Sequence, residues 1–257
     1  WPSSTPGFHR VDLPELDATL DLTVGDAAWA LNQWAGRADA WFLDGFAPST
    51  NPDMWSDAVL DGVSARSAPD ARLATFTVAG AVRRGLAERG FTVEKRPGHG
   101  RKRERLEARR AGSPVEVPSL PKVAILGAGV AGAAVARALR DQGITPVVVA
   151  EAIGAGASGF PSALVTPRFD LGDTEVAALF AQALERARAL YRALPGAVVA
   201  EGVIQRAAME RDIARFARVA EQVLWEPGSM TAQADGALTM AAALTVRPRA
   251  ILEGWLE

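Results

Sequence analysis

The chain has 257 residues, of which 49% are hydrophobic and 23% charged, and its formal net charge at pH 7 is -2. These values exclude a strongly basic protein, and the absence of cysteine excludes disulfides, thiolate nucleophiles and Cys-ligated metal sites. Only His9 and His99 could supply imidazole, and we expect both on the surface and no metal site. No run approaches the roughly 18 apolar residues of a membrane span, so we expect no membrane contact and a cytoplasmic location.

Strand and helix patterns alternate along the first half of the chain. In order, the sequence predicts a strand at 18–24, a short strand at 40–44, a helix at 56–65, a strand at 73–78, a helix at 81–89, and strands at 91–95 and 103–109 that pair antiparallel. Strands joined by helices imply an open, mostly parallel sheet.

A linker is predicted at residues 112–121, because three prolines between Arg109 and Pro121 remove donors and follow no strand or helix period. The second half then predicts strands at 122–126 and 146–150 around a helix at 130–142, helices at 175–194 and 211–223, strands at 197–199 and 202–205, and a last helix at 250–257. Because the chain starts at Trp1 rather than Met, we expect it to be an internal piece of a longer protein.

The most informative motif is a glycine-rich turn between the first two strands of the second half. Its residues match G-x-G-x-x-G in the expected context, since a strand precedes it, a helix follows it, and Glu151 ends the next strand. In this pattern the first glycine permits a tight turn, the second lets the backbone approach a pyrophosphate, and the third lets helix and strand pack. The helix amino end attracts phosphate, and Glu151 can accept from ribose hydroxyls. The predicted contacts are Gly127, Ala128, Gly129, Val130, Ala131, Gly132 and Glu151.

A second loop of small residues, Gly154 to Gly159, follows Glu151. It resembles the second FAD loop of the D-amino-acid-oxidase and glycine-oxidase superfamily, which covers the pyrophosphate. That resemblance favours FAD over NAD and adds Ala157 and Ser158 to the predicted contacts. A plain flexible connector is the alternative interpretation of this loop.

Two stretches of the first half carry a further resemblance. Residues 39–55, Asp-Ala-Trp-Phe-Leu-Asp-Gly-Phe-Ala-Pro-Ser-Thr-Asn-Pro-Asp-Met-Trp, and residues 73–86 with 98–104 resemble the methyltransferase domain of the bifunctional tRNA wobble-uridine modification enzymes, the MnmC family. In that family the methyltransferase precedes an FAD-dependent oxidoreductase, and the predicted order here is the same.

The resemblance implies a domain plan and a two-step reaction. Residues 1–111 would be the C-terminal part of a Rossmann-like methyltransferase sheet, 112–121 a linker, and 122–257 the N-terminal βαβ part of an FAD domain, an α/β fold throughout. The FAD domain would convert 5-carboxymethylaminomethyl(-2-thio)uridine in tRNA to the aminomethyl form. The methyltransferase would then methylate that amine from S-adenosylmethionine.

Two carboxylates of the first half stand where such a methyltransferase needs them. Asp26 follows the predicted strand 18–24, where a carboxylate can accept from the adenine amino group of S-adenosylmethionine. Asp44 ends the strand 40–44, at the carboxyl edge where open α/β sheets bind ligands, and is the predicted catalytic residue. A turn or helix-cap aspartate is the alternative interpretation of Asp44.

Positive charge is concentrated just before the linker. Residues 83–110 contain eleven Lys or Arg and four Asp or Glu, a net charge of +7, so the rest of the chain carries -9. Clustered cations suit an RNA backbone, although a charge run is more often a solvated face. Arg101, Lys102 and Arg103 are the predicted tRNA contacts.

The sequence departs from the family pattern at two places. No glycine-rich strand and turn that would cradle S-adenosylmethionine occurs before Gly25, and Phe160-Pro161 stands where the family usually has Asn-Pro. Two other functions therefore stay open: a standalone FAD amine or amino-acid oxidase with an unrelated N-terminal domain, and a non-catalytic fragment that binds nucleotide or RNA.

Overall fold

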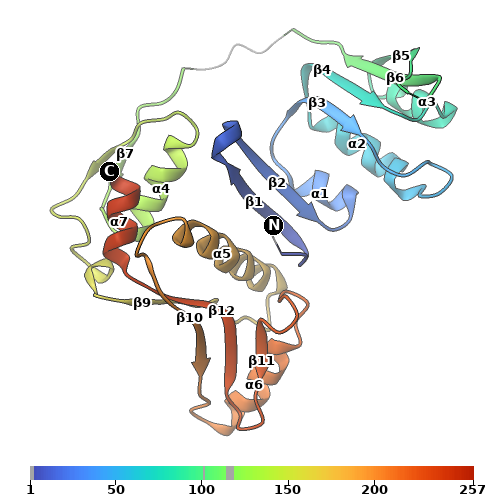
Figure 1. Ribbon diagram of the computed structural model, residues 1–257. Helices are drawn as coiled ribbons and strands as arrows, with labels where there is room; N and C mark the ends of the chain where they lie inside the picture. Colours follow the sequence, from blue (N-terminus) through green and yellow to red (C-terminus); the bar gives the residue numbers. More distant parts are fainter. Residues whose placement is uncertain (1–2, 101, 114–118) are drawn as a thin grey trace. The chain divides into compact units, whose positions relative to one another are not determined.

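The computed structural model describes residues 3–100, 102–113 and 119–257. The chain divides into two compact units, one formed by residues 1–24 with 119–257 and the other by residues 25–118 (Figure 1). Arg101 and part of the predicted linker, residues 114–118, lie outside the described residues.

The unit of residues 25–118 is a four-stranded sheet with helices packed on one face. Strand order is β3-β4-β6-β5, and the core joins helix and strand residues such as Leu60, Leu86, Leu73 and Ala108. Alternate residues of the strands point to the other face, where Phe42 is 82% exposed. The elements are α1 (Ala27–Gln33), β3 (Ala38–Leu43), η2 (Asp53–Trp55), α2 (Asp57–Ala65), β4 (Ser67–Thr75), α3 (Gly80–Glu88), β5 (Phe91–Pro97) and β6 (Glu104–Arg110).

The expectation of a mostly parallel sheet is wrong for this unit. Only β3 and β4 run parallel, while β6 lies antiparallel to both β4 and β5. The reason is the short connection between β5 and β6, because a tight turn can join only antiparallel strands. The predicted pairing of residues 91–95 with 103–109 is confirmed, but β6 then occupies the place beside β4 that a parallel strand would have taken.

The other unit contains the βαβ arrangement that the second half predicts. β7 (Ala124–Leu126) and β8 (Val147–Val149) pair in parallel, and α4 (Val130–Arg140) connects them. The helix ends near Gly143, whose φ of +76° is a left-handed conformation that glycine adopts readily. α4 packs against α7 (Pro248–Leu256), and both contribute to a core with Ala133, Leu252 and Trp255.

A second sheet, with four antiparallel strands, follows in the same unit. Its order is β10-β12-β11, with β9 also paired to β12, and a separate core beneath α6 includes Phe216, Leu238 and Met240. The two short strands predicted at 197–199 and 202–205 are one strand, interrupted by irregular register near Gly202 at φ +84°. The elements are η3 (Ala157–Gly159), β9 (Ala163–Val165), α5 (Thr174–Arg192), β10 (Val198–Gln205), α6 (Glu210–Ala220), β11 (Met230–Ala232) and β12 (Leu238–Val246).

The first residues of the chain form a hairpin that belongs to this same unit. β1 (Gly7–Leu13) and β2 (Ala18–Val24) pair antiparallel across η1 (Pro14–Leu16), and β1 contacts α5. The strand predicted at 18–24 is confirmed, but it pairs only with β1 among the described strands and joins no larger sheet. His9, expected on the surface, is only 5% exposed, and its Nε2 donates to the carbonyl of Thr5 at 2.8 Å.

Candidate functional site

The glycine-rich turn lies between β7 and the amino end of α4. Gly127 has φ +106°, and its amide donates to the carbonyl of Val149 at 2.8 Å, which ties the turn to β8. Gly129 is the N-cap residue of α4. A Cβ on Gly132 would lie 2.0 Å from the carbonyl oxygen of Gly127. A side chain at this position would therefore push the turn away from the first turn of α4. Glycine at this position lets the turn pack closely on the start of α4.

The second glycine-rich loop is locked onto the first. The amide of Gly154 donates to the carbonyl of Ala128 at 3.0 Å, and the amide of Val130 donates to the hydroxyl oxygen of Ser158 at the same distance. Ser158 and Ala157 belong to the short helix η3. Because the Ser158 oxygen is the acceptor, its own proton remains available to a ligand oxygen at the amino end of α4.

Glu151 comes two residues after the end of β8 and lies beside the first loop. It lines a hollow of about 340 Å³ together with Ala128, Ile153 and Leu256. Its side chain is exposed, so it can accept hydrogen bonds from a ligand without being desolvated first. The structure thus brings the glycine turn, Ser158 and Glu151 together.

This donor set fits one end of a dinucleotide. Helix amides and a hydroxyl proton can hold the two negative phosphates, and a carboxylate two residues past a strand can accept from a ribose. A Cβ on Gly129 would lie 3.2 Å from the hydroxyl oxygen of Ser158, so a side chain fits poorly at this position. With glycine there, the backbone rather than a side chain faces the phosphates.

Asp44 lies at the carboxyl edge of the sheet in the other unit. Leu43 of β3 is level with Thr75 of β4, so Asp44 and Phe76 follow neighbouring parallel strands at the same edge. Asp44 is exposed and is not a helix cap; its amide donates to the carbonyl of Phe42 at 3.2 Å. This is the sheet edge at which the sequence predicts the reacting amine.

An aromatic cluster connects the Asp44 loop with the basic turn. The indole of Trp55 donates to the carbonyl of Phe46 at 2.7 Å and meets the ring of Phe76 edge-on, with centroids 6.4 Å apart. The ammonium of Lys102 lies 5.0 Å from the centroid of the Phe76 ring. Sequence reasoning missed Trp55 and Phe76 as part of this edge, because Trp55 comes just before the predicted helix 56–65 and Phe76 lies inside the predicted strand 73–78.

The cations of residues 83–110 divide into two groups. Five are bound to carboxylates, with Lys95 on Glu104, Arg96 on Glu94, Arg105 on Glu107, Arg109 on Asp70, and Arg89 on Asp57 and Asp61. The Arg109 hydrogen bond lowers the pKa of Asp70 below its usual range. Within the described part of the chain, Arg83, Arg84, Lys102 and Arg103 make no ion pair. The predicted contact Arg101 lies outside the described residues.

Asp26 has a different local role. It is the N-cap of α1, and its carboxylate accepts from the amide of Trp29 at 2.8 Å. The capped helix packs against α2. The structure therefore brings Asp44 and Lys102 to one edge, whereas Asp26 stands at the start of a separate helix with one carboxylate oxygen engaged by the cap.

Family comparison now assigns both halves. Residues 122–257 match the family described as FAD dependent oxidoreductase. The chain belongs to the FAD-dependent oxidoreductase family. Residues 1–111 match a second family, the S-adenosyl-L-methionine-dependent methyltransferases. The expected cofactors, FAD and S-adenosylmethionine, are thereby confirmed at the level of the two families, and the α/β fold class agrees with both.

Similar proteins match the chain across both halves. The chain is 55% identical, over 99% of its length and 45% of the relative, to the tRNA 5-methylaminomethyl-2-thiouridine biosynthesis bifunctional protein MnmC of Caulobacter vibrioides. The protein of the same name from Caulobacter sp. strain K31 is 52% identical over 99% of this chain and 44% of its own length. The resemblance to the MnmC family is confirmed, and the chain spans less than half the length of these relatives.

A solved structure with a related name also matches. The crystal structure of MNMC2 from Aquifex aeolicus shares 29% identity, covering 38% of this chain and 33% of the other, with a TM-score of 0.34. Among the described residues, no helix is long and apolar enough to cross a membrane. The same residues contain no group of three or more metal-ligating side chains.

Proposed function

We propose that this chain is part of a bifunctional enzyme that modifies the wobble uridine of tRNA. The observation that carries the proposal is a single chain that matches a methyltransferase family and then an FAD-dependent oxidoreductase family, with 55% identity to an MnmC protein over 99% of its length. The FAD-dependent step yields the 5-aminomethyl group from 5-carboxymethylaminomethyl(-2-thio)uridine. The S-adenosylmethionine-dependent step then methylates that amine. We also propose that the enzyme acts in the cytoplasm.

The proposed domain limits are 1–111 for the methyltransferase part, 112–121 for the linker and 122–257 for the oxidoreductase part. The ranges of the two family matches support these limits. The contact-based units support a break near residue 118, and they group the first 24 residues with the oxidoreductase part.

In the oxidoreductase part, FAD would supply the acceptor for the electrons that leave the substrate carbon. The residues of this chain bind and orient it. The amides at the amino end of α4, from Gly129 to Gly132 apart from that of Val130, which donates to Ser158, would hold the pyrophosphate together with the Ser158 hydroxyl. Glu151 is placed to accept from the ribose hydroxyls, and Ala157 keeps the second loop free of bulk beside the phosphates.

In the methyltransferase part, Asp44 is the proposed catalytic residue. Methyl transfer requires the amine lone pair to be unprotonated and aligned with the methyl group, so orientation matters more than acid strength. An exposed carboxylate at the sheet edge can accept an N–H from that amine and turn its lone pair away from Asp44. Asp26 is the proposed acceptor for the adenine amino group, through the oxygen that the α1 cap leaves open.

The tRNA backbone is proposed to contact Arg101, Lys102 and Arg103. Lys102 and Arg103 keep their charge unneutralised, and Lys102 stands over the aromatic cluster that reaches the Asp44 loop. Cations without carboxylate partners give the larger gain when they replace counterions on phosphate.

Nucleoside analysis of tRNA tests the reaction. Cells that lack the gene should accumulate carboxymethylaminomethyluridine, and a copy carrying Asp44→Asn should instead accumulate the aminomethyl form. Asp53→Asn, in the same loop but in η2, is the matched control and should leave the final nucleoside unchanged. Unchanged nucleosides in the deletion strain would favour a standalone amine oxidase and overturn the proposal.

Salt-dependent tRNA binding tests the contact surface. Replacing Lys102 and Arg103 by alanine should reduce the slope of log K against log salt by about 0.7–0.9 for each lost phosphate contact. The control, Arg96→Ala with Arg105→Ala, removes the same charge from carboxylate-paired positions and should change the slope little. Equal slopes for the two double variants would contradict the assignment.

A further inference from the structure

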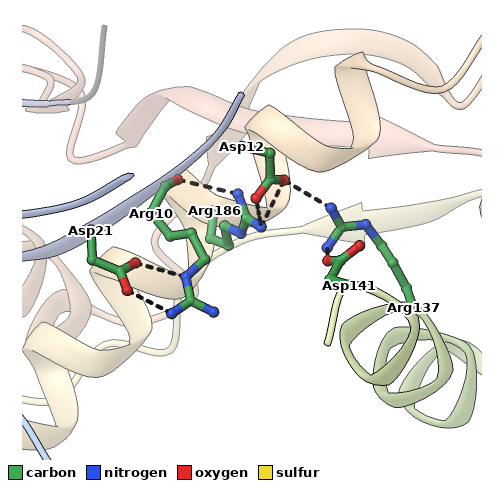
Figure 2. Close-up of polar contacts among 6 residues, drawn as sticks. All are labelled: Arg10, Asp12, Asp21, Arg137, Asp141 and Arg186. Carbon is green, nitrogen blue, oxygen red and sulfur yellow. Dashed lines mark hydrogen bonds and ion pairs between the residues drawn. The ribbon is translucent and has the colours of Figure 1, made fainter. Parts of the chain in front are cut away.

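The arginines of the unit formed by residues 1–24 and 119–257 differ in whether a carboxylate holds them. Arg186 donates to both carboxylate oxygens of Asp12 at 2.9 Å, and Arg137 donates to one of them at 2.8 Å (Figure 2). In the same view Arg10 is paired with Asp21 at 2.7 Å. A carboxylate partner offsets the positive charge of its arginine, so an anionic ligand is attracted most strongly by exposed arginines that have none.

Helix α6 carries three exposed arginines on one side. Arg211, Arg215 and Arg218 are spaced i, i+4 and i+7, which places them along a single stripe of the helix. A different side of α6 carries Phe216 and Val219, which are buried in the core that the helix shares with the sheet, and α6 lies against β11 (Figure 1). The core therefore fixes which side of the helix faces water, and that side carries the arginines.

A fourth exposed arginine comes from the loop between β9 and α5. The guanidinium of Arg215 donates to the carbonyl of Phe169 at 3.1 Å, which brings this loop against α6. Gln222, just past the end of the helix, donates to the carbonyl of Asp170 at the same distance. The loop also holds Arg168, whose guanidinium lies over the ring of a phenylalanine of α5. We call the four residues Arg168, Arg211, Arg215 and Arg218 the α6 arginine face.

No carboxylate of the described residues forms an ion pair with the α6 arginine face. Asp170 lies in the same loop, and its side chain accepts from the amides of Gly172 and Asp173, both at 2.9 Å. These amides are the main cause of a lowered pKa of Asp170, and the charges of Arg168 and Arg215 lower that pKa further. Both arginines therefore lie near one carboxylate that is already hydrogen-bonded to its own loop.

The acidic residues of α6 lie away from the stripe of arginines. Asp212 accepts from the amides of Ala208 and Met209 at 3.1 Å and 3.0 Å, so it serves the start of the helix. Glu210 and Glu221 fall on a flank of their own by the helical period. The helix thus separates its charges, and the arginine face is positive throughout.

The spacing of these charges fits the backbone of a nucleic acid. Arg211 to Arg218 spans about 10 Å of helix axis, since each residue adds about 1.5 Å. One strand of a nucleic-acid duplex carries a phosphate about every 3.4 Å along its axis, and a guanidinium can bind two phosphate oxygens at once. A short run of neighbouring phosphates can therefore meet all the arginines of the stripe.

We propose that the α6 arginine face binds the phosphate backbone of tRNA on behalf of the oxidoreductase half. The proposal rests on the proposed function, in which the flavin-dependent step also acts on a nucleoside of tRNA. The contacts proposed above, residues 101–103, all belong to the methyltransferase half, whereas the α6 arginine face gives the oxidoreductase half backbone contacts of its own. Backbone contacts position an RNA without reading its bases, so this surface accepts different tRNAs.

Salt-dependent binding of an unmodified tRNA transcript to the whole protein, without flavin or S-adenosylmethionine, tests the surface. Arg211→Gln with Arg218→Gln removes two positive charges, and glutamine keeps a similar helix propensity, so the fold should be retained. The slope of log K against log salt should become shallower by about 1.4–1.8. The control, Arg192→Gln with Arg249→Gln, removes the same charge from two ion-paired helix positions and should change the slope little.

Equal slopes for the two double variants would refute the α6 assignment. Weaker binding of polyglutamate with unchanged binding of tRNA would also refute it, because the face would then suit an acidic protein. Nucleoside analysis separates this outcome from a failure of the proposed function. If the deletion strain accumulates carboxymethylaminomethyluridine while the two slopes are equal, only the α6 assignment fails. If the deletion leaves the nucleosides unchanged, the proposed function fails, and a shallower slope would still assign RNA to α6.

Discussion

The two candidate sites are built in different ways. The site at α4 consists mainly of backbone, because three glycines and a serine set where amides point, and its parts lie within 32 residues of sequence, from Gly127 to Ser158. The site at the sheet edge consists of side chains from separate loops, Asp44, Phe76 and Lys102, that strand register brings together. A local backbone site can be recognised from a sequence motif, whereas a site assembled by register depends on the topology of the sheet.

The largest expected effect is the loss of unfolding free energy when a buried leucine of either unit is truncated. Leu106 of β6 and Leu244 of β12 are both fully buried, and each truncation to alanine should cost about 2–5 kcal/mol in its own unit. Calorimetry should show two transitions, with Leu106→Ala lowering one and Leu244→Ala the other. A single transition that both variants lower equally would show that the units unfold together.

Glycine substitutions should separate close packing from backbone strain at α4. Gly132→Ala places a Cβ against the carbonyl of Gly127 and should destabilise the protein by about 3 kcal/mol, with loss of flavin binding. Gly127→Ala meets no atom within 4 Å but must adopt φ +106°, at a cost of about 1–2 kcal/mol. Denaturant unfolding and flavin titration measure both; the reverse order of effects would contradict the packing of this turn.

A smaller effect is expected from the hydroxyl that links the two loops. Ser158→Ala removes the acceptor of the Val130 amide and should cost about 1 kcal/mol of stability, as the loss of a helix N-cap does. Flavin affinity should fall by roughly the same free energy, near fivefold to tenfold. Ser162→Ala, exposed and just beyond this loop, is the control and should leave both quantities unchanged.

The smallest expected effect is on how the melting temperature falls at acidic pH. The folded pKa of Asp12 lies below its ordinary value of 3.8, so its ion pairs stabilise the protein above that pH and are lost as pH falls through the folded value. The melting temperature of the unit that contains the hairpin should therefore fall more steeply between pH 5 and about pH 3 in the unaltered protein than in Asp12→Asn. Parallel curves would show that Asp12 contributes nothing to the acid response.

Sequence reasoning succeeded where structure is local. The βαβ unit, the glycine turn, the strand at 18–24 and the antiparallel pairing of residues 91–95 with 103–109 each follow from contiguous patterns. It failed where contacts between segments distant in the sequence determine the structure. The place of β6 beside β4, the burial of His9 against Thr5 and the docking of β1 on α5 depend on partners that no local period reveals.

The same limit applies to the charges. The count of eleven cations in residues 83–110 could be made from the sequence, but which of them carboxylates neutralise could not. Arg109 pairs with Asp70, which lies 39 residues earlier in the chain. Arg96 pairs with Glu94, two residues away on its own strand. Only the folded sheet distinguishes Lys102 and Arg103 from these neutralised cations.

The contact between Asp12 and Arg186 has a consequence for biosynthesis. The two residues are 174 positions apart, and a ribosome that adds about 5–20 residues per second needs roughly 9–35 seconds to make the chain between them. During that interval the nascent hairpin lacks its helix, while residues 25–118 are already complete and free to fold. The contact between Asp12 and Arg186 can therefore form only after residues 25–118 have been made.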